Sequence, residues 1–298
     1  MSTGDLFEGF PEEEAPRPAD PGRRIFVGTS GYSFADWVGP FYPPGTRPGD
    51  FLPFYARHFD TVEVNSSYYR VPSPGAIEQM ERKTPPGFRF MVKLNQAMTH
   101  ERSLEAGLVC DFRAALEPLK AAGKYEGLLA QFPWGFRRTT ENETHLAALR
   151  ESLAGEPLFV EFRHASWVAP DLAAWLRERR LGFCAVDEPR IESLMPPVTM
   201  VTGDDAYVRF HGRNAKNWWG SRPSGAAGAA PGRTGVASGD RYDYEYRTDE
   251  LKEWVQKVRE LAGQARRTYL FFNNCHAGQA ARSAKLMQEL LRQQGLPA

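Results

Sequence analysis

Short hydrophobic segments recur along the chain, and segments with a helical spacing of apolar residues lie between them. Short runs rich in Val, Ile, Phe and Tyr are typical of buried β-strands, whereas an apolar repeat near 3.6 residues indicates a helix. The pattern predicts strands at 24–30, 61–67, 88–95, 125–133, 158–164, 182–188, 206–212 and 268–274. It predicts helices at 50–58, 74–83, 108–122, 143–153, 170–180, 249–262 and 277–292. Only the link between the sixth and seventh strands lacks a clear helical pattern.

Strands that alternate with helices predict a parallel sheet, because each helical crossover returns the chain to the same end of the sheet. Eight such units close naturally into a (β/α)8 barrel of the TIM type, and 298 residues suit one such domain. An open, doubly wound sheet is the alternative, since the number of strands does not establish closure. We therefore expect an α/β fold with a single TIM-type barrel domain over residues 24–298.

Two segments do not follow this pattern. Residues 1–23 are acidic and rich in Pro and have no periodicity, so we expect a disordered tail. Residues 212–246 form a long non-periodic segment directly after the seventh strand. Its Gly, Ala, Ser and Pro content predicts a mobile loop, and the Trp and Tyr residues at its two ends are suited to cover a ligand.

Polar residues occupy alternate positions late in most of the predicted strands. In the fifth strand, Glu161 and Arg163 alternate with apolar residues that suit contact with the helices. The polar set should therefore point into the barrel at the C-terminal ends of the strands, where barrel enzymes build their sites. In the sixth strand the same rule assigns Asp187 to the inward set and Cys184 to the outward set. The residues expected at this mouth are Ser30, Glu63, Asn65, Lys93, Gln131, Glu161, Arg163, Asp187, Arg209, His211 and Asn273.

These charges have a structural and a functional interpretation. As a purely structural layer they would form internal ion pairs that fill the barrel. Burying an ion costs several kcal/mol, and apolar residues would fill the same space with at least equal stability. We therefore interpret the mouth as a functional site.

The residue types at the mouth suit acid/base chemistry on an anionic substrate that carries a phosphate or a carboxylate. Guanidinium and ammonium groups bind such anions, while carboxylates and imidazoles move protons near neutral pH. The catalytic candidates are Glu63, Glu161, Asp187 and His211. The candidates for binding the substrate are Ser30, Tyr32, Asn65, Lys93, Gln131, Arg163, His164, Trp167, Arg209, Asn214, Trp218, Asn273 and Asn274.

Two other functions stay open at this point. The carboxylates and His211 could hold Mg, Mn or Zn in a metal-dependent hydrolase, isomerase or phosphodiesterase of the endonuclease type, although three inward cations would repel a divalent ion. No cofactor is predicted, and a divalent metal is the alternative. A non-catalytic binder of the same anion would need the cations but not the carboxylates.

Composition narrows the partners and the location. The chain has 37 basic and 37 acidic residues, so its charge gives no support for broad nonspecific affinity for nucleic acid, although a nucleic-acid end stays an alternative ligand. No apolar stretch approaches membrane-spanning length, and no signal peptide is recognisable. The three cysteines lack zinc-like spacing. We expect a cytoplasmic protein whose partner is a small anionic ligand.

Several longer motifs occur in order along the chain. They are "VGTSGYSFADWVGPFYP", "TVEVNSSYYRVPS", "FRFMVKLN", "QFPWGF", "VEFRHASW", "YVRFHGRN", "RYDYEY" and "FFNNCHAGQAARSA". Together they resemble the DUF72 family, also called YecE-like, over the whole chain after the tail. The resemblance implies a TIM-type barrel and no established reaction. The Gly/Ala-rich middle of the 212–246 loop is not part of the family pattern.

Overall fold

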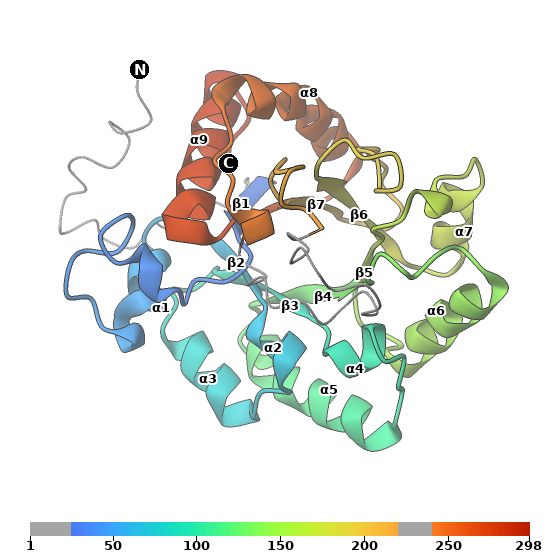
Figure 1. Cartoon of the computed structure of the whole chain (residues 1–298). Helices are drawn as coiled ribbons and strands as arrows, with labels where there is room; N and C mark the ends of the chain where they lie inside the picture. Colours follow the sequence, from blue (N-terminus) through green and yellow to red (C-terminus); the bar gives the residue numbers. More distant parts are fainter. Residues whose placement is uncertain (1–24, 220–239) are drawn as a thin grey trace, which may run out of the picture.

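The computed structural model describes residues 25–219 and 240–298, and its eight strands form one parallel sheet in the order β1-β8-β7-β6-β5-β4-β3-β2. This confirms the TIM-type barrel, which Figure 1 shows as a ring of strands surrounded by helices. The expectations for the tail at 1–23 and for the middle of the 212–246 loop concern residues outside the described ones. The strands are β1 (Ile25–Thr29), β2 (Thr61–Val64), β3 (Arg89–Lys93), β4 (Tyr125–Gln131), β5 (Leu158–Glu161), β6 (Gly182–Asp187), β7 (Ala206–Phe210) and β8 (Thr268–Phe272).

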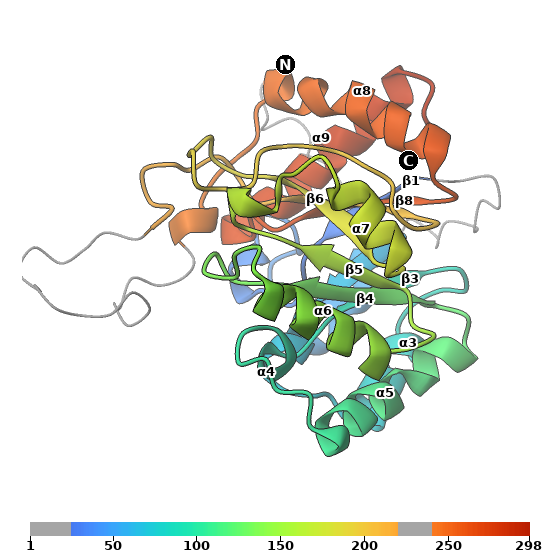
Figure 2. The ribbon, with the colours of Figure 1, turned by 90° about the vertical axis from the view of Figure 1, so that its right-hand side faces the viewer.

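Helices cover the outside of the barrel, with α8 and α9 on one flank and α3 and α5 on the opposite flank (Figure 2). Each predicted helix is confirmed, and the link between β6 and β7 contains no helix among its described residues. Two single-turn helices, α2 and α4, follow β2 and β3 and escape prediction because they are too short to show a periodicity. No helix of the described residues is long and apolar enough to cross a membrane. The helices are α1 (Phe51–Tyr55), α2 (Ser66–Tyr69), α3 (Pro74–Arg82), α4 (Gln96–Thr99), α5 (Ala106–Ala121), α6 (Thr140–Ser152), α7 (Leu172–Glu178), α8 (Thr248–Gln264) and α9 (Gln279–Gln293).

The barrel is nearly closed between β1 and β2. These strands share a single bridge, between Ser30 and Glu63, in place of a full ladder. Gly28 lets the two backbones approach, because a Cβ atom there would stand 2.3 Å from the carbonyl oxygen of Thr61. The hydroxyl of Tyr55 donates to the same carbonyl at 3.0 Å and accepts from a backbone N–H of β1 at 2.9 Å.

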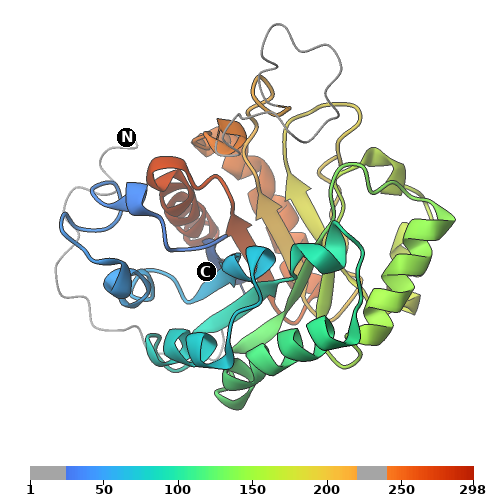
Figure 3. The ribbon, with the colours of Figure 1, turned by 60° about the horizontal axis from the view of Figure 1, so that its bottom comes forward.

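The interior of the barrel is filled by an apolar layer that is separate from the core between sheet and helices. Its members come from β1 and from β3 to β8, whose parallel course is visible in Figure 3. Because alternate strand residues face the same side, this layer fixes which of the later strand residues also point inward. The layer consists of Phe26, Met91, Leu129, Phe159, Cys184, Tyr207, Tyr269 and Phe271.

Candidate functional site

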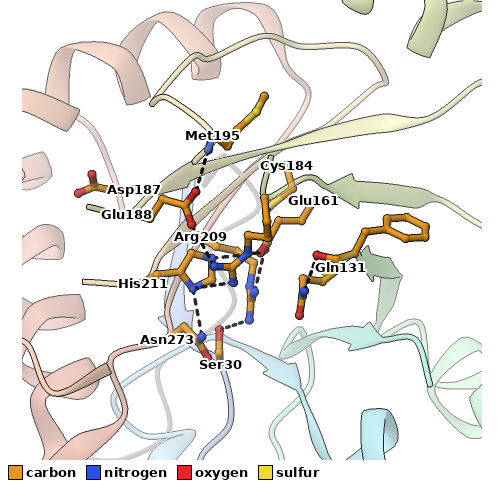
Figure 4. A network of polar contacts seen from close by, with 12 residues as sticks. Ser30, Gln131, Glu161, Cys184, Asp187, Glu188, Met195, Arg209, His211 and Asn273 are labelled. Carbon is orange, nitrogen blue, oxygen red and sulfur yellow. Dashed lines mark hydrogen bonds and ion pairs between the residues drawn. The ribbon is translucent and has the colours of Figure 1, made fainter. Parts of the chain in front are cut away.

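A cluster of ion pairs lies at the C-terminal ends of the strands, and Figure 4 shows the part of it around Glu161 and Arg209. Glu161 is at its centre, with one carboxylate oxygen 2.7 Å from Nη1 of Arg209 and the other 2.5 Å from Nε of Arg163. Nη2 of Arg209 donates to Glu63 at 2.7 Å and to Oγ of Ser30 at 3.2 Å. We call Glu63, Glu161, Arg163 and Arg209 the ion-pair cluster. The two glutamates are 0% exposed and Arg209 is 1% exposed, so most of the cluster is shielded from solvent.

His211 lies beside the ion-pair cluster as a neutral imidazole. Its Nδ1 lies 3.1 Å from the side-chain amide nitrogen of Asn273, which can only donate, so Nδ1 is the acceptor and Nε2 carries the hydrogen. Nε2 lies 3.2 Å from Glu161. Burial and the charge of Arg163 lower the pKa of His211 to about 3. The predicted meeting of this histidine with Glu161, Arg163 and Asn273 is thus observed.

Charge balance determines the state of the central carboxylate. Burial opposes ionisation of Glu161, but Arg163 and Arg209 outweigh it and hold the pKa of Glu161 well below its usual range. Glu63 has a second partner besides Arg209, and this one is neutral: the hydroxyl of Tyr207 donates to it at 2.5 Å. The sequence does not predict Tyr207 as a site residue, because an aromatic residue at this position of a strand is typical of the core.

Lys93 differs from the other cations at the mouth because no carboxylate among the described residues forms an ion pair with it. Its Nζ donates at 2.8 Å to the neutral side chain of Gln131 and lies 4.2 Å from the ring centre of Tyr68. The side chain is half-buried at the end of β3. Burial, followed by repulsion from Arg209, lowers the pKa of Lys93 to about 7. The amine therefore exchanges a proton near neutral pH.

The predicted position of Asp187 at the mouth is wrong. Cys184 faces the barrel interior, so alternation along β6 directs Asp187 outward and Glu188 inward. Asp187 points away from the cluster (Figure 4) and forms an ion pair with Arg213 at 3.0 Å. The prediction failed because it assigned Cys184 to the helix-facing apolar set, whereas a small thiol also fits the barrel interior.

Glu188 is the inward acid that the sequence missed. It accepts from Nη1 of Arg163 at 3.0 Å and from the backbone N–H of Met195 at 3.0 Å. Burial and the nearby charge of Glu161 raise the pKa of Glu188 to about 8 against the opposing charge of Arg163. The sequence does contain this acid, directly after Asp187, and the alternation rule finds it once Cys184 is assigned to the barrel interior.

Glu188 is expected to make stability depend on pH. Its folded pKa is above the value of roughly 4.3 in an unfolded chain, so stability is greatest below that value and is lost as pH rises through about 8. Ionisation of Glu188 should therefore lower the free energy of unfolding by roughly 1 to 3 kcal/mol between these two pKa values. Glu188→Gln has no charge to gain, so this fall should be absent from its pH profile. Urea unfolding at several pH values measures it. Glu192→Gln, an exposed position on the same loop, is the matched control, and parallel profiles for both variants would contradict the assignment.

The two described ends of the 212–246 loop lie over the cluster. The ring of Trp218 is 5.9 Å from the guanidinium of Arg163, and the ring of Tyr242 is 6.2 Å from that of His211. These two aromatic rings are themselves 6.5 Å apart. Trp218, a predicted ligand-binding residue, therefore lies beside Arg163, and its contact with a ligand stays a prediction. Asn65 also reaches the mouth, where its amide donates to the backbone of Ser30 at 3.1 Å.

Five predicted ligand-binding residues have contacts elsewhere. Trp167 is buried in the helix-facing core, and Tyr32 packs against the same core. His164 caps the 3-10 turn that follows β5. Asn214 donates to a backbone carbonyl of its own loop, and Asn274 donates to that loop and to α9. These residues shape the surroundings of the mouth, and their proposed contact with a substrate stays a prediction.

The donor geometry of a metal site is not found in the part of the chain that the structure describes. Neither 25–219 nor 240–298 contains a group of three or more His, Cys, Asp or Glu side chains placed to hold a metal ion. The inward carboxylates are instead engaged by the guanidinium groups of Arg163 and Arg209.

A cavity of about 770 Å³ lies at the opposite end of the barrel, around the N-terminal ends of β5, β6 and β7. Its charged lining residues are balanced, because arginines such as Arg180 and Arg266 alternate with acids such as Glu156 and Asp205. In TIM barrels this end serves stability, whereas catalytic groups lie at the other end. The mouth is therefore the better candidate.

The chain is similar to proteins whose function is not described by their names. A family model described as "Protein of unknown function DUF72" matches residues 26–298. The UPF0759 protein YunF of Bacillus subtilis (strain 168) is 31% identical over 279 residues, which are 90% of this chain and 94% of the relative. The UPF0759 protein YecE of Escherichia coli (strain K12) is 31% identical over 153 residues, or 49% of this chain and 50% of the relative.

Two solved structures of DUF72 family proteins have folds similar to that of this chain. A DUF72 family protein from Thermotoga maritima MSB8 superimposes with a TM-score of 0.79 at 38% identity, covering 91% of this chain and all of that one. A DUF72 family protein from Enterococcus faecalis V583 gives a TM-score of 0.76 at 26% identity, covering 90% of this chain and 95% of that one. The similarity extends over the whole barrel.

Proposed function

This chain belongs to the DUF72 family of proteins of unknown function, so its activity has to be argued from the site, and we propose that it is an enzyme that transfers a proton at a small anionic substrate bound at the barrel mouth. The observation that carries the proposal is the amine of Lys93. It is half-buried at the mouth, is held by the neutral Gln131, and has its pKa lowered to about 7. A group with a pKa near the working pH is the most effective acid/base catalyst.

The ion-pair cluster is better suited to support Lys93 than to move the proton itself. A buried Glu161 whose pKa lies well below its usual range is a weak base, and both of its oxygens are already occupied by arginines. His211 is likewise a weak base, since its pKa is about 3 and its Nδ1 is engaged by Asn273. The proton-transfer role first predicted for these residues is therefore assigned to Lys93.

The charge of the mouth supports an anionic substrate. Within the ion-pair cluster the charges of Arg163 and Arg209 are offset by those of Glu63 and Glu161. The protonated form of Lys93 adds a positive charge that no ion pair among the described residues compensates. A phosphate or carboxylate beside it would supply that charge and would stabilise the protonated amine.

Binding of sulfate is expected to weaken as pH rises from about 6 to about 8.5, because Lys93 loses its charge over this range. Sulfate is the probe because its own charge is constant there. If the bound anion raises the pKa of Lys93 by about one unit, the affinity changes by about tenfold. Calorimetric titration measures the change. Lys93→Arg should bind sulfate at all these pH values, and Lys93→Met should bind it weakly throughout. Unchanged affinity in Lys93→Met would exclude an anion site at this amine.

The enzymatic role is tested by incubating the protein in D2O with a mixture of sugar phosphates and 2-oxo acids. Mass spectrometry then identifies any compound that gains deuterium or changes in mass. We expect the wild type to alter at least one compound and Lys93→Arg to alter it about 10² to 10⁴ times more slowly, since Arg keeps the charge but does not release a proton. Binding without any change in the bound compound would favour a non-catalytic binder instead. Equal rates in both proteins would remove Lys93 from the mechanism.

A further inference from the structure

The surroundings of the Lys93 amine suit covalent chemistry as well as proton transfer. An amine attacks a carbonyl carbon only when its lone pair is free, and a carboxylate partner would hold it as an ammonium ion. Gln131 accepts a hydrogen bond from Nζ without that effect, because its amide oxygen carries no full charge. Nζ therefore has a fixed position at the end of β3 and keeps its nucleophilic form accessible.

We propose that Lys93 condenses with an aldehyde or ketone group of the substrate to form a Schiff base. This inference rests on the proposed function and names its substrate class, an anionic carbonyl compound. The nitrogen lone pair forms the new C–N bond, and the carbonyl C–O bond breaks. The carbonyl oxygen leaves as water with the two protons of the neutral amine, and no oxidant or reductant is needed.

The residues around Nζ also suit the charged form of this product. A protonated Schiff base is a cation, and the ring of Tyr68 presents its face to that position at 4.2 Å. His100 packs edge-on against Tyr68 at 5.2 Å, and its pKa is lowered to about 4 by burial and by Lys93. Because His100 is neutral, it adds no repulsion. The cation of the Schiff base replaces the ammonium ion without changing the net charge beside the buried arginines.

The bound carbonyl compound would gain an electron sink from this bond. A protonated imine withdraws electrons from the adjacent carbon, so a proton there leaves more readily than from the parent ketone. The nitrogen is then engaged in the Schiff base, so removal of that proton needs a second base, and a water molecule that reaches the half-buried Lys93 can supply it. The covalent step at Lys93 would thus come first, and the proton transfer at the substrate would follow it at the same mouth.

The test traps the Schiff base chemically in the full-length protein. Wild type is incubated separately with dihydroxyacetone phosphate, pyruvate and glyceraldehyde in the presence of cyanoborohydride, which reduces an imine to a stable secondary amine. Peptide mapping by mass spectrometry locates the adduct. We expect at least one anionic probe to modify Lys93 about 10² times faster than the exposed Lys252 on α8 near pH 7, because a pKa of about 7 leaves much of the Lys93 amine unprotonated there.

Two comparisons make the result decisive. The first compares the labelling of Lys93 and Lys252 within the wild-type protein, so it does not depend on a variant that has to fold. The second uses Lys93→Arg, which should show only the background labelling of exposed lysines. Labelling of Lys93 at no more than the rate of Lys252 with all three probes would overturn the Schiff base. If Lys93-dependent exchange in D2O is nevertheless observed, the proposed proton transfer stands and only the covalent step is lost. If neither is observed, both fail.

Discussion

Replacing Arg209 with Met is expected to lower the free energy of unfolding by about 3 to 5 kcal/mol. The guanidinium group bridges Glu63 and Glu161, each at 2.7 Å, and all three side chains are shielded from solvent. Its removal leaves two buried carboxylates without their shared counter-charge. Isolated buried ions are unstable, so the variant should be least stable where both carboxylates are ionised. Urea unfolding at neutral pH measures the loss.

Two controls separate this effect from a simple loss of packing. Lowering the pH should restore part of the stability of Arg209→Met, because protonation removes carboxylate charge that Arg163 alone does not balance. Adding Glu63→Gln and Glu161→Gln to Arg209→Met should recover part of the loss at neutral pH. The exposed pair of Arg82 and Glu78 on α3 is the matched comparison, and Arg82→Met should cost less than about 1 kcal/mol. A similar small cost for Arg209→Met would show that the cluster does not stabilise the barrel.

The barrel was predictable because its signals are local and repeated. Each strand is a short apolar run, each crossover has a helical period, and the polar residues recur at the same end. The alternation rule placed Glu63, Glu161, Arg163, Arg209 and His211 at one mouth, where the glutamates and arginines form ion pairs and His211 lies beside them as a neutral imidazole. The positions of the helices followed from the same periodicity, although α1 and α7 are shorter than predicted.

The remaining parts of the site depend on facts that the sequence does not contain. Cys184 suits either side of a strand, so the inward set of β6 was shifted by one residue and Asp187 replaced Glu188. Trp167 follows the polar end of β5 closely, yet the turn after that strand directs its ring into the core. The sequence also did not indicate which cations are paired. Only the distances identify Lys93 as the cation held by a neutral partner.

The amine of Lys93 is expected to react with acetic anhydride with a midpoint near pH 7, about three units below an ordinary lysine. Burial lowers its pKa first, and Arg209 and Arg163 lower it further by repulsion. Glu63 and Glu161 oppose the shift because they favour the ammonium ion. Only the unprotonated amine is acylated, so trace labelling from about pH 5 to about pH 10, followed by peptide mass spectrometry, reports the titration directly.

The charges around Lys93 also predict in which direction its labelling midpoint should move when Glu161 is replaced. Glu161→Gln removes a group that favours the ammonium ion, so the labelling midpoint of Lys93 should fall further. Exposed Lys252 is the internal control, and its profile should be the same in both proteins. The midpoint is used because a half-buried amine also reacts more slowly for steric reasons, which change the rate but not the pH dependence. A midpoint near pH 10 in the wild type would mean that Lys93 is a permanent cation. The mouth would then bind an anion without exchanging protons with it, and neither acid/base nor Schiff-base chemistry could be assigned to this amine.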